Sequence, residues 1–312
     1  MTRKFNFKHI TIVGCGDIGV RVSLLLQKQT CHVKAMARSG ESAERLGAYR
    51  IEPILADLDD RDSLKKLNLT DQLVFYLAPP PGGGTVDSRM RNFCQAIGSG
   101  QVPIKLVYIS TSGVYGDCAG SWVTEDTPVH PQTTRAHRRL DAETTLCEWG
   151  QTYGVSTPIL RVTGIYGPGR LPIARLQQGH PVLKEDESPL TNRIHAEDLA
   201  AICLDAARHG QHAEVYNVSD GRPGSMTEYF NTIADLLGIP RPPQISMADA
   251  KTQMTPMMLS YLCESRRMAN NKMLSDLRVT LQYPDLAAGL KQAIGQLAQP
   301  NMGYYGSMKS QH

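Results

Sequence analysis

Residues 10–19 read Ile-Thr-Ile-Val-Gly-Cys-Gly-Asp-Ile-Gly, an apolar run that breaks into glycines before a helical pattern resumes. After the glycines, apolar residues recur at the spacing of one helix face, at Ile18, Val22, Leu25 and Leu26. A helix with one apolar face must bury that face, and a neighbouring sheet is the expected partner. The stretch therefore predicts a strand, a tight turn and a helix.

The three glycines of this turn have the spacing Gly14-x-Gly16-x-x-Gly19. Gly14 allows the chain to turn sharply, Gly16 has no Cβ to hold a pyrophosphate away from the backbone, and Gly19 lets the helix approach the strand. The first helical residues, Asp17 and Ile18, lie where free N–H groups and a partial positive charge attract an anion. We interpret the turn as a dinucleotide-binding site, and a plain glycine-rich turn is the alternative.

Length and composition are those of a globular protein of one large or two modest domains, with 312 residues, 41% hydrophobic and 20% charged. The net charge of +3 comes from 33 basic and 30 acidic residues, with no basic run that suits nucleic acid or a membrane surface. Seven scattered cysteines without a Cys-x-x-Cys pair predict neither a disulfide framework nor a metal site. No apolar stretch resembles a signal sequence or a membrane span, so we expect a cytoplasmic protein.

Residues 32–38 alternate as a strand and end about 20 residues beyond the last glycine, where a dinucleotide fold reads the ribose. An acidic residue at this place favours NAD by bonding the 2′-hydroxyl. Here the residues are Arg38 and Ser39, which suit a 2′-phosphate. The sequence therefore favours NADP as the cofactor, with NAD as the alternative.

Three more strands are expected at residues 51–56, 73–78 and 104–109, with a helix at 87–97. The run at 73–78 is apolar throughout, as in a strand buried on both faces. Regular alternation of strands and helices predicts a parallel, doubly wound α/β sheet.

Two of these strands end in residues that should meet the cofactor. Asp57 and Leu58 follow the third strand, where the adenine is expected, and Ala78 and Pro79 end the fourth. Residues 79–84 are prolines and glycines, which form a loop at the carboxyl edge where open α/β sheets bind ligands. A plain linker is the alternative.

Four later motifs follow one another in a recognisable order. Residues 110–116 read Ser-Thr-Ser-Gly-Val-Tyr-Gly, 160–169 read Leu-Arg-Val-Thr-Gly-Ile-Tyr-Gly-Pro-Gly, 192–199 read Asn-Arg-Ile-His-Ala-Glu-Asp-Leu, and 216–221 read Tyr-Asn-Val-Ser-Asp-Gly. Together with the glycine turn, they resemble the extended short-chain dehydrogenase/reductases, the superfamily of nucleotide-sugar epimerases and dehydratases. The resemblance implies a Rossmann fold with a smaller C-terminal substrate lobe.

The same resemblance divides the chain. Residues 8–165 with 194–222 are expected to form the NAD(P)-binding domain, and residues 166–193 with 223–298 the substrate-binding lobe. Residues 299–312 are short, polar and glycine-containing, and we expect a mobile tail. The resemblance also admits a homodimer built from two helices of each subunit.

The family's chemistry, as the resemblance implies, uses a Ser or Thr, a Tyr and a Lys: the tyrosine exchanges a proton with the substrate while the nicotinamide exchanges a hydride. Thr111 matches the Ser/Thr position. Aligned on the residues around the next helix, Arg135 stands at the tyrosine position and Arg139 at the lysine position. Within residues 8–298, which the two expected domains cover, no Tyr-x-x-x-Lys occurs.

Arginine stays protonated at ordinary pH, so Arg135 cannot replace the tyrosine as a general acid or base. Arg135 could instead clamp an anionic group of the substrate, and Arg139 could bond the cofactor ribose or a phosphate. The alternative for both is a surface helix salt-bridged to Asp141 and Glu143.

A proton must then come from another group, and the candidates on motif segments are Tyr115, Tyr166, His137 and His195. Tyr115 is retained as a candidate catalytic residue at the edge of the expected cleft.

By analogy with the family, residues 170–193 cover the substrate. Arg170 and Arg193 there suit a diphosphate or carboxylate, and scattered solvated arginines are the alternative.

Two functions remain open from the sequence. The first is an NAD(P)-dependent oxidoreductase or epimerase acting by a non-standard mechanism on a hydroxyl or carbonyl of a small substrate, such as a nucleotide-linked sugar. The second is a regulatory protein that binds NAD(P) and acts through a partner.

Overall fold

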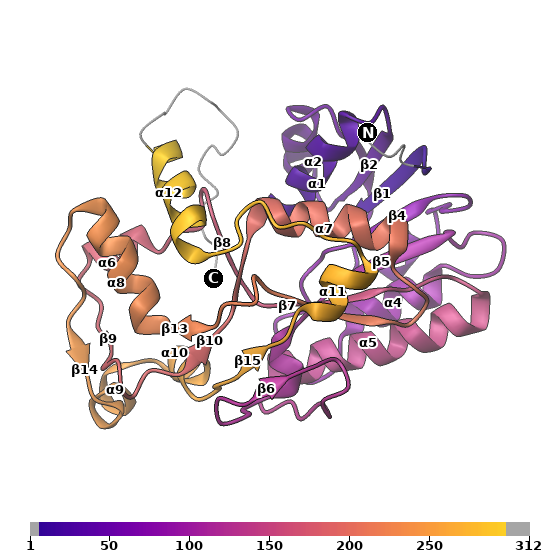
Figure 1. Ribbon diagram of the computed structural model, residues 1–312. Helices are drawn as coiled ribbons and strands as arrows, with labels where there is room; N and C mark the ends of the chain where they lie inside the picture. The colour runs from indigo at the N-terminus through magenta and orange to yellow at the C-terminus, as the bar shows by residue number, and fades with distance from the viewer. Residues whose placement is uncertain (1–5, 298–312) are drawn as a thin grey trace.

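A seven-stranded parallel sheet with the order β12-β7-β5-β4-β1-β2-β3 forms the centre of the computed structural model, which describes residues 6–297 (Figure 1). Its strands are β1 (His9–Val13), β2 (His32–Ala37), β3 (Glu52–Leu55), β4 (Leu73–Tyr76), β5 (Lys105–Thr111), β7 (Ile159–Val162) and β12 (Val215–Val218). The strand order reverses between β1 and β4, which is the switch point where doubly wound sheets bind dinucleotides. The predicted α/β Rossmann fold is confirmed.

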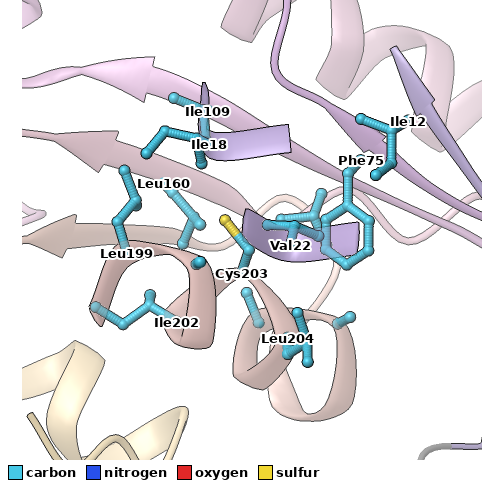
Figure 2. Close-up of a cluster of buried hydrophobic side chains, with 14 of the residues drawn as sticks. Ile12, Ile18, Val22, Phe75, Ile109, Leu160, Leu199, Ile202, Cys203 and Leu204 are labelled. Carbon is cyan, nitrogen blue, oxygen red and sulfur yellow. The ribbon is translucent and has the colours of Figure 1, made fainter. Parts of the chain in front are cut away.

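Helices cover both faces of the sheet. One face packs against α1 (Asp17–Gln27), α2 (Gly40–Gly47) and α7 (Ala196–His209), and the other against α3 (Arg61–Leu64), α4 (Ser88–Ala96) and α5 (Thr134–Tyr153). Figure 2 shows part of the first core, where Ile12 and Phe75 of the sheet lie beside Val22 of α1, and Leu199 and Ile202 of α7 belong to the same cluster. Alternate residues of each strand supply the two cores, which explains the uninterrupted apolar run at residues 73–76.

The fifth strand is longer than its apolar pattern indicates. We expected it to end at Ile109, but β5 continues through Thr111 because Ser110 and Thr111 pair with Arg161 and Val162 of β7. Polar residues therefore extend to the carboxyl edge of the sheet, where the short 3-10 helix η1 (Ser112–Tyr115) begins.

The rest of the chain builds a smaller lobe beside the sheet (Figure 1). We use this name for α6 (Ile173–Gln177), β9 (Val182–Leu183), α8 (Met226–Leu237), β14 (Gln244–Ile245), α9 (Met247–Gln253), α10 (Pro256–Leu262) and α12 (Leu286–Leu297). Its cores are separate from those of the sheet and include Leu176, Phe230 and Leu290 in one cluster and Leu183 and Met254 in another.

One segment departs from the expected division. We placed residues 223–298 in the substrate-binding lobe, but α11 (Asn271–Asp276) buries Met273 and nearby Leu277 in the core of the sheet. The preceding strand β15 (Arg267–Met268) pairs with β6 (Trp122–Val123), an excursion that follows β5. Local apolar content does not tell which core a segment joins.

Two short strand pairings complete the path between the sheet and the smaller lobe. The strand β8 (Gly164–Tyr166) pairs with β11 (Arg193–His195), and β10 (Leu190–Thr191) pairs with β13 (Gly224–Ser225). Within residues 6–297, no helix combines the length and the apolar character needed to cross a bilayer. The expected mobile tail at residues 299–312 lies outside the described residues.

Candidate active site

The glycine turn between β1 and α1 has the geometry that its spacing predicts. Gly14 has φ +88°, and a Cβ at this position would lie 2.4 Å from the backbone N and Cα of Ala78. A Cβ on Gly19 would lie 3.1 Å from Cys15 Sγ, so only glycine fits easily between α1 and the strand. No heavy atom lies within 4 Å of the place of a Cβ on exposed Gly16. The backbone at Gly16 is therefore open to a ligand, while Gly14 is required by packing and Gly19 is closely packed.

The first residue of α1 connects this turn to the chain that follows β8. Asp17 Oδ1 accepts a hydrogen bond from Arg21 Nε at 2.9 Å, and Asp17 Oδ2 pairs with Arg170 Nη1 at 3.0 Å. Arg21 Nη2 also donates to the Pro168 carbonyl at 2.9 Å. Arg170, which we placed in the substrate site, therefore lies against the cofactor turn, and Ile18 next to Asp17 is buried in the sheet core.

The predicted ribose-reading residues lie on the surface at the end of β2. Arg38 is exposed, and the Ser39 hydroxyl caps α2 by accepting a hydrogen bond from the N–H of Ser42 at 3.3 Å. The hydrogen-bonded Arg89 guanidinium and, to a smaller extent, the charge of Arg38 hold the pKa of Asp59 below its usual range. Arg38 is thus close to the loop after β3.

That loop holds the predicted adenine-contacting residues. Leu58 is buried, and Asp57 Oδ1 accepts a hydrogen bond from the N–H of Asp59 at 3.0 Å. At the end of β4, the Pro79 carbonyl accepts a hydrogen bond from Arg89 Nη1 at 3.2 Å. Since β1, β2, β3 and β4 are parallel neighbours, their carboxyl ends bring all of these residues to one edge.

A cavity of about 350 Å³ opens at the carboxyl ends of β5 and β7, between the sheet and the smaller lobe. Residues from both parts line it: Thr111, Ser112, Gly113, Arg135, Thr163, Gly164, Ile165, Tyr166, Leu190, Thr191, Asn192, Arg193, Met226, Tyr229, Tyr261, Glu264 and Arg266. Of the predicted catalytic and substrate-binding residues, three line this cavity, namely Thr111, Arg135 and Arg193.

Arg135 reaches the cavity from the first turn of α5. The helix begins at Thr134, because the side chain of Thr133 accepts a hydrogen bond from the N–H of Ala136 at 3.3 Å. Arg135 Nη1 donates to Ser260 Oγ at 2.7 Å, and its guanidinium carbon lies 4.0 Å from the centre of the Tyr261 ring. Arg135 therefore connects the sheet domain to α10 of the smaller lobe.

Arg139, one turn further along α5, lies behind the cavity. Its Nη1 donates to the carbonyls of Ala78 at 3.3 Å and Ile109 at 2.9 Å and to the Tyr108 hydroxyl at 3.1 Å. Burial raises the pKa of Tyr108 to about 12, so this phenol is neutral at ordinary pH. Arg139 thereby places a positive charge between the ends of β4 and β5.

The alternative of a surface helix salt-bridged to Asp141 and Glu143 is wrong for both Arg135 and Arg139. Asp141 pairs with Arg91 on α4, and Glu143 Oε2 pairs with Arg161 Nη2 of β7 at 2.7 Å.

Tyr115 belongs to a buried polar network and does not line the cavity. Its hydroxyl donates to Asn217 Oδ1 at 2.8 Å and accepts from Arg161 Nη1 at 3.0 Å. Glu143 Oε1 also accepts a hydrogen bond from Ser110 Oγ at 2.5 Å. Burial raises the pKa of Tyr115, so the phenol remains protonated and fixes the ends of β5, β7 and β12 to one another.

The other three candidate proton donors are also accounted for. His195 is fully buried, and its Nδ1 accepts a hydrogen bond from the N–H of Glu197 at 3.3 Å; burial lowers the pKa of His195 to about 4. Tyr166 lines the cavity, but burial raises its pKa far above the usual value. His137 is exposed. Neither histidine lines the cavity.

Sequence reasoning missed several residues of the cavity wall, among them the three polar residues Tyr261, Glu264 and Arg266. Arg266 Nη1 pairs with Glu264 Oε2 at 2.9 Å and donates to the carbonyl of Gly116. Glu264 Oε1 and Arg266 Nε are buried without a hydrogen-bond partner among the described residues. The charged cluster at residues 264–267 is the only signal for them in the sequence, and it has no motif spacing.

The fold and the site together define a class of protein. A doubly wound sheet with a glycine turn at its switch point, and a cavity between the sheet and a smaller lobe, is the architecture of an extended short-chain dehydrogenase/reductase. The chain belongs to the NAD dependent epimerase/dehydratase family, whose model matches residues 10–219.

Similar proteins extend along most of the chain. Protein YeeZ of Escherichia coli strain K12 is 28% identical over 294 residues, which cover 89% of this chain and 97% of that protein. A functionally unknown conserved protein from Silicibacter pomeroyi has a structure that matches with a TM-score of 0.78 and 26% identity, covering 93% of this chain and 99% of that one. DesIV, a dTDP-glucose 4,6-dehydratase from Streptomyces venezuelae solved with NAD bound, matches with a TM-score of 0.77 and 19% identity, covering 94% of this chain and 97% of that one.

Proposed function

We propose that this protein is an NAD(P)-dependent oxidoreductase or epimerase that acts on a hydroxyl or carbonyl of a small substrate. One observation carries the proposal: the open glycine turn after β1 and the cavity that contains Thr111 lie at the same carboxyl edge of one parallel sheet. Membership in the NAD dependent epimerase/dehydratase family and the NAD bound to DesIV support a nicotinamide cofactor.

The residues at the sheet edge fit such a cofactor. Gly16 leaves space for the pyrophosphate at the N-terminus of α1, next to Gly14 and Gly19. The adenosine half would meet Arg38 and Ser39 after β2 and Asp57 and Leu58 after β3, and Ala78 and Pro79 would line the middle. When bound, the nicotinamide supplies or accepts a hydride.

The exposed guanidinium of Arg38 supports NADP as the preferred cofactor. A 2′-phosphate offers charge-assisted hydrogen bonds to a guanidinium, which the 2′-hydroxyl of NAD cannot match.

The remaining chemistry is assigned to the chain's own residues by position. Thr111 lines the cavity with a hydroxyl that can orient a carbonyl oxygen, and Arg135 and Arg193 can bind anionic groups of the substrate. Arg139 and Tyr115 lie behind the cavity wall and act as positioning residues. Arg170 can influence substrate binding only indirectly, because its salt bridge with Asp17 holds its own loop in place.

The test is a calorimetric titration of the protein with NADPH and NADH in parallel, followed by hydride exchange with a panel of nucleotide sugars and aldehydes. We expect NADPH to bind more tightly and at least one substrate to turn over, with turnover lost in Thr111→Ala. Absence of binding by both cofactors would overturn the proposal.

A second function is favoured by the replacement of the family's tyrosine and lysine by Arg135 and Arg139. In this case the protein binds NAD(P) without catalysis and acts through a partner. Cofactor binding with no hydride exchange across the panel would support this second function over the first.

A further inference from the structure

The cavity contains more cations than anions. Three guanidinium groups line it, those of Arg135, Arg193 and Arg266, and the single carboxylate is Glu264, which pairs with Arg266. Arg193 is 6% exposed, lies 4.3 Å from the centre of the Tyr229 ring, and has its pKa lowered by burial. Within residues 6–297, neither Arg135 nor Arg193 forms a salt bridge, and the carboxylates of Asp220 and Glu228 act on Arg193 only through their charge. An uncompensated cavity of this kind favours an anionic ligand.

Arg135 differs from the other two arginines because it belongs to the first turn of α5, which packs near the end of β5. A Cβ on Gly113 would lie 3.5 Å from Thr111 and 3.8 Å from Ala136, so the first turn of α5 packs directly against the end of β5. Arg135 and Thr111 both line the cavity, and the proposed function puts the reacting carbon next to Thr111.

A neutral sugar hydroxyl does not explain a guanidinium at this place. The Arg135 side chain already has two acceptors, Ser260 Oγ at 2.7 Å and the Ser260 carbonyl at 3.5 Å, and both belong to a neutral serine. A guanidinium has five N–H donors in a planar fork, and this fork matches the two oxygens of a carboxylate.

We propose that the substrate carries a carboxylate on the reacting carbon or on the carbon next to it, and that Arg135 binds this carboxylate while Thr111 holds the reacting oxygen. This inference rests on the proposed function and specifies its substrate class. A 2-oxo acid, a 2-hydroxy acid and a uronic acid all meet the description. Arg193 lies elsewhere on the wall and can bind a second anionic group, whereas Arg266 is already paired with Glu264.

The test uses two pairs of ligands that differ in the carboxylate: pyruvate against hydroxyacetone, and UDP-glucuronic acid against UDP-glucose. Each is titrated calorimetrically into the protein saturated with the cofactor form that prevents turnover, NADP⁺ for the carbonyl pair and NADPH for the sugar pair. In at least one pair, we expect the carboxylate to bind about tenfold or more tightly than its neutral partner.

Variants show whether Arg135 causes the difference. Arg135→Gln should abolish the preference for the carboxylate while changing the affinity of the neutral partner by less than about threefold, and Arg135→Lys should retain part of the preference. Arg241→Gln is the matched control, because Arg241 is paired with Asp235 on the exposed surface of the smaller lobe. It removes the same charge and should leave the preference intact.

Three outcomes would overturn the inference: equal affinities within both pairs, no binding of any of the four ligands, or equal weakening of both members of a pair by Arg135→Gln. The last outcome would mean that Arg135 only fixes α10 through Ser260. If Arg135→Gln lowers the melting temperature, Arg135→Lys decides, since it keeps the cation. Failure of these tests while NADPH or NADH still binds leaves the proposed function standing, whereas absence of binding by both cofactors refutes the proposed function.

Discussion

The cofactor turn and the cavity wall at Arg135 are built in opposite ways. The turn lies within ten consecutive residues, and what matters at Gly14 and Gly16 is the side chain that is absent. The wall joins Thr111, Arg135 and Tyr261 from three distant parts of the chain, and what matters there is the chemistry of each side chain. A chain can therefore retain the residues that bind a dinucleotide while the residues that contact its substrate change.

The largest effect expected from breaking the turn is in Gly14→Ala. Its Cβ would lie 2.4 Å from the backbone of Ala78, at a φ of +88° that side chains disfavour. We expect the free energy of unfolding to fall by about 3–5 kcal/mol, measured by urea denaturation. Gly16→Ala is the control and should cost less than about 1 kcal/mol, because no heavy atom lies within 4 Å of its Cβ. Equal losses would show that Gly14 is not needed for packing.

Gly16→Val should break binding without breaking the fold. The new side chain enters the space that we assign to the pyrophosphate, so the affinity for NADPH should fall about 100-fold or more, while the melting temperature changes by only a few degrees. Calorimetric titration and thermal unfolding check the two parts. Unchanged NADPH affinity would show that the cofactor does not bind at the turn.

His195 lies behind the cavity, and its buried imidazole should make the stability of the folded protein depend on pH. Its pKa is lowered from 6.5 to about 4, so the folded protein binds fewer protons than the unfolded chain between these values. The stability that neutral His195 contributes is therefore complete above pH 6.5 and is lost as the pH falls toward 4.

We expect the wild type to lose about 1–3 kcal/mol more over this range than His195→Asn, measured by urea denaturation at several pH values. Asparagine keeps an acceptor for the N–H of Glu197 but does not titrate. Parallel curves for the two proteins would contradict a buried neutral histidine.

The smallest effect is expected at the edge of the turn region, in Arg38→Ala. Since Arg38 is exposed, its loss should leave stability unchanged and weaken NADPH binding about tenfold, with little change for NADH. Parallel titrations with the two cofactors measure the ratio. Equal weakening of both would show that Arg38 does not read the 2′-phosphate.

Most of the fold could be predicted from the sequence because its signals are local. Apolar runs predict the strands, and the alternation of strands with helices predicts a sheet covered on both faces. The spacing of the glycines predicts the switch point at β1. The sequence pattern gave the wrong end for β5, because pairing of Ser110 and Thr111 with the distant strand β7 extends it. It also gave the wrong core for the segment around Met273, because an apolar residue can pack in either lobe.

The site was less accessible to sequence reasoning. Thr111, Arg135 and Arg193 could be placed in the cavity because motifs carry them, and Arg139 and Tyr115 are nearby but behind its wall. Arg266 and Glu264 come from a segment without a motif, and only the packing of the smaller lobe brings them to Gly116. Charge partners such as Asp17 for Arg170 lie up to 153 residues apart, a separation that no local pattern encodes.

The contact of Asp17 with Arg170 has a thermodynamic consequence. This salt bridge joins the residue at the start of α1 to the loop that leads into the smaller lobe. The hydrogen bond from Arg21 to the Pro168 carbonyl strengthens the connection. A ligand that disrupts this connection at one site changes the affinity of the other site for its own ligand. Thermodynamic linkage requires the two ligands to change each other's affinity by the same factor. Binding of the nucleotide and binding of the substrate are therefore expected to be coupled through this salt bridge, in addition to the direct contact that hydride transfer requires.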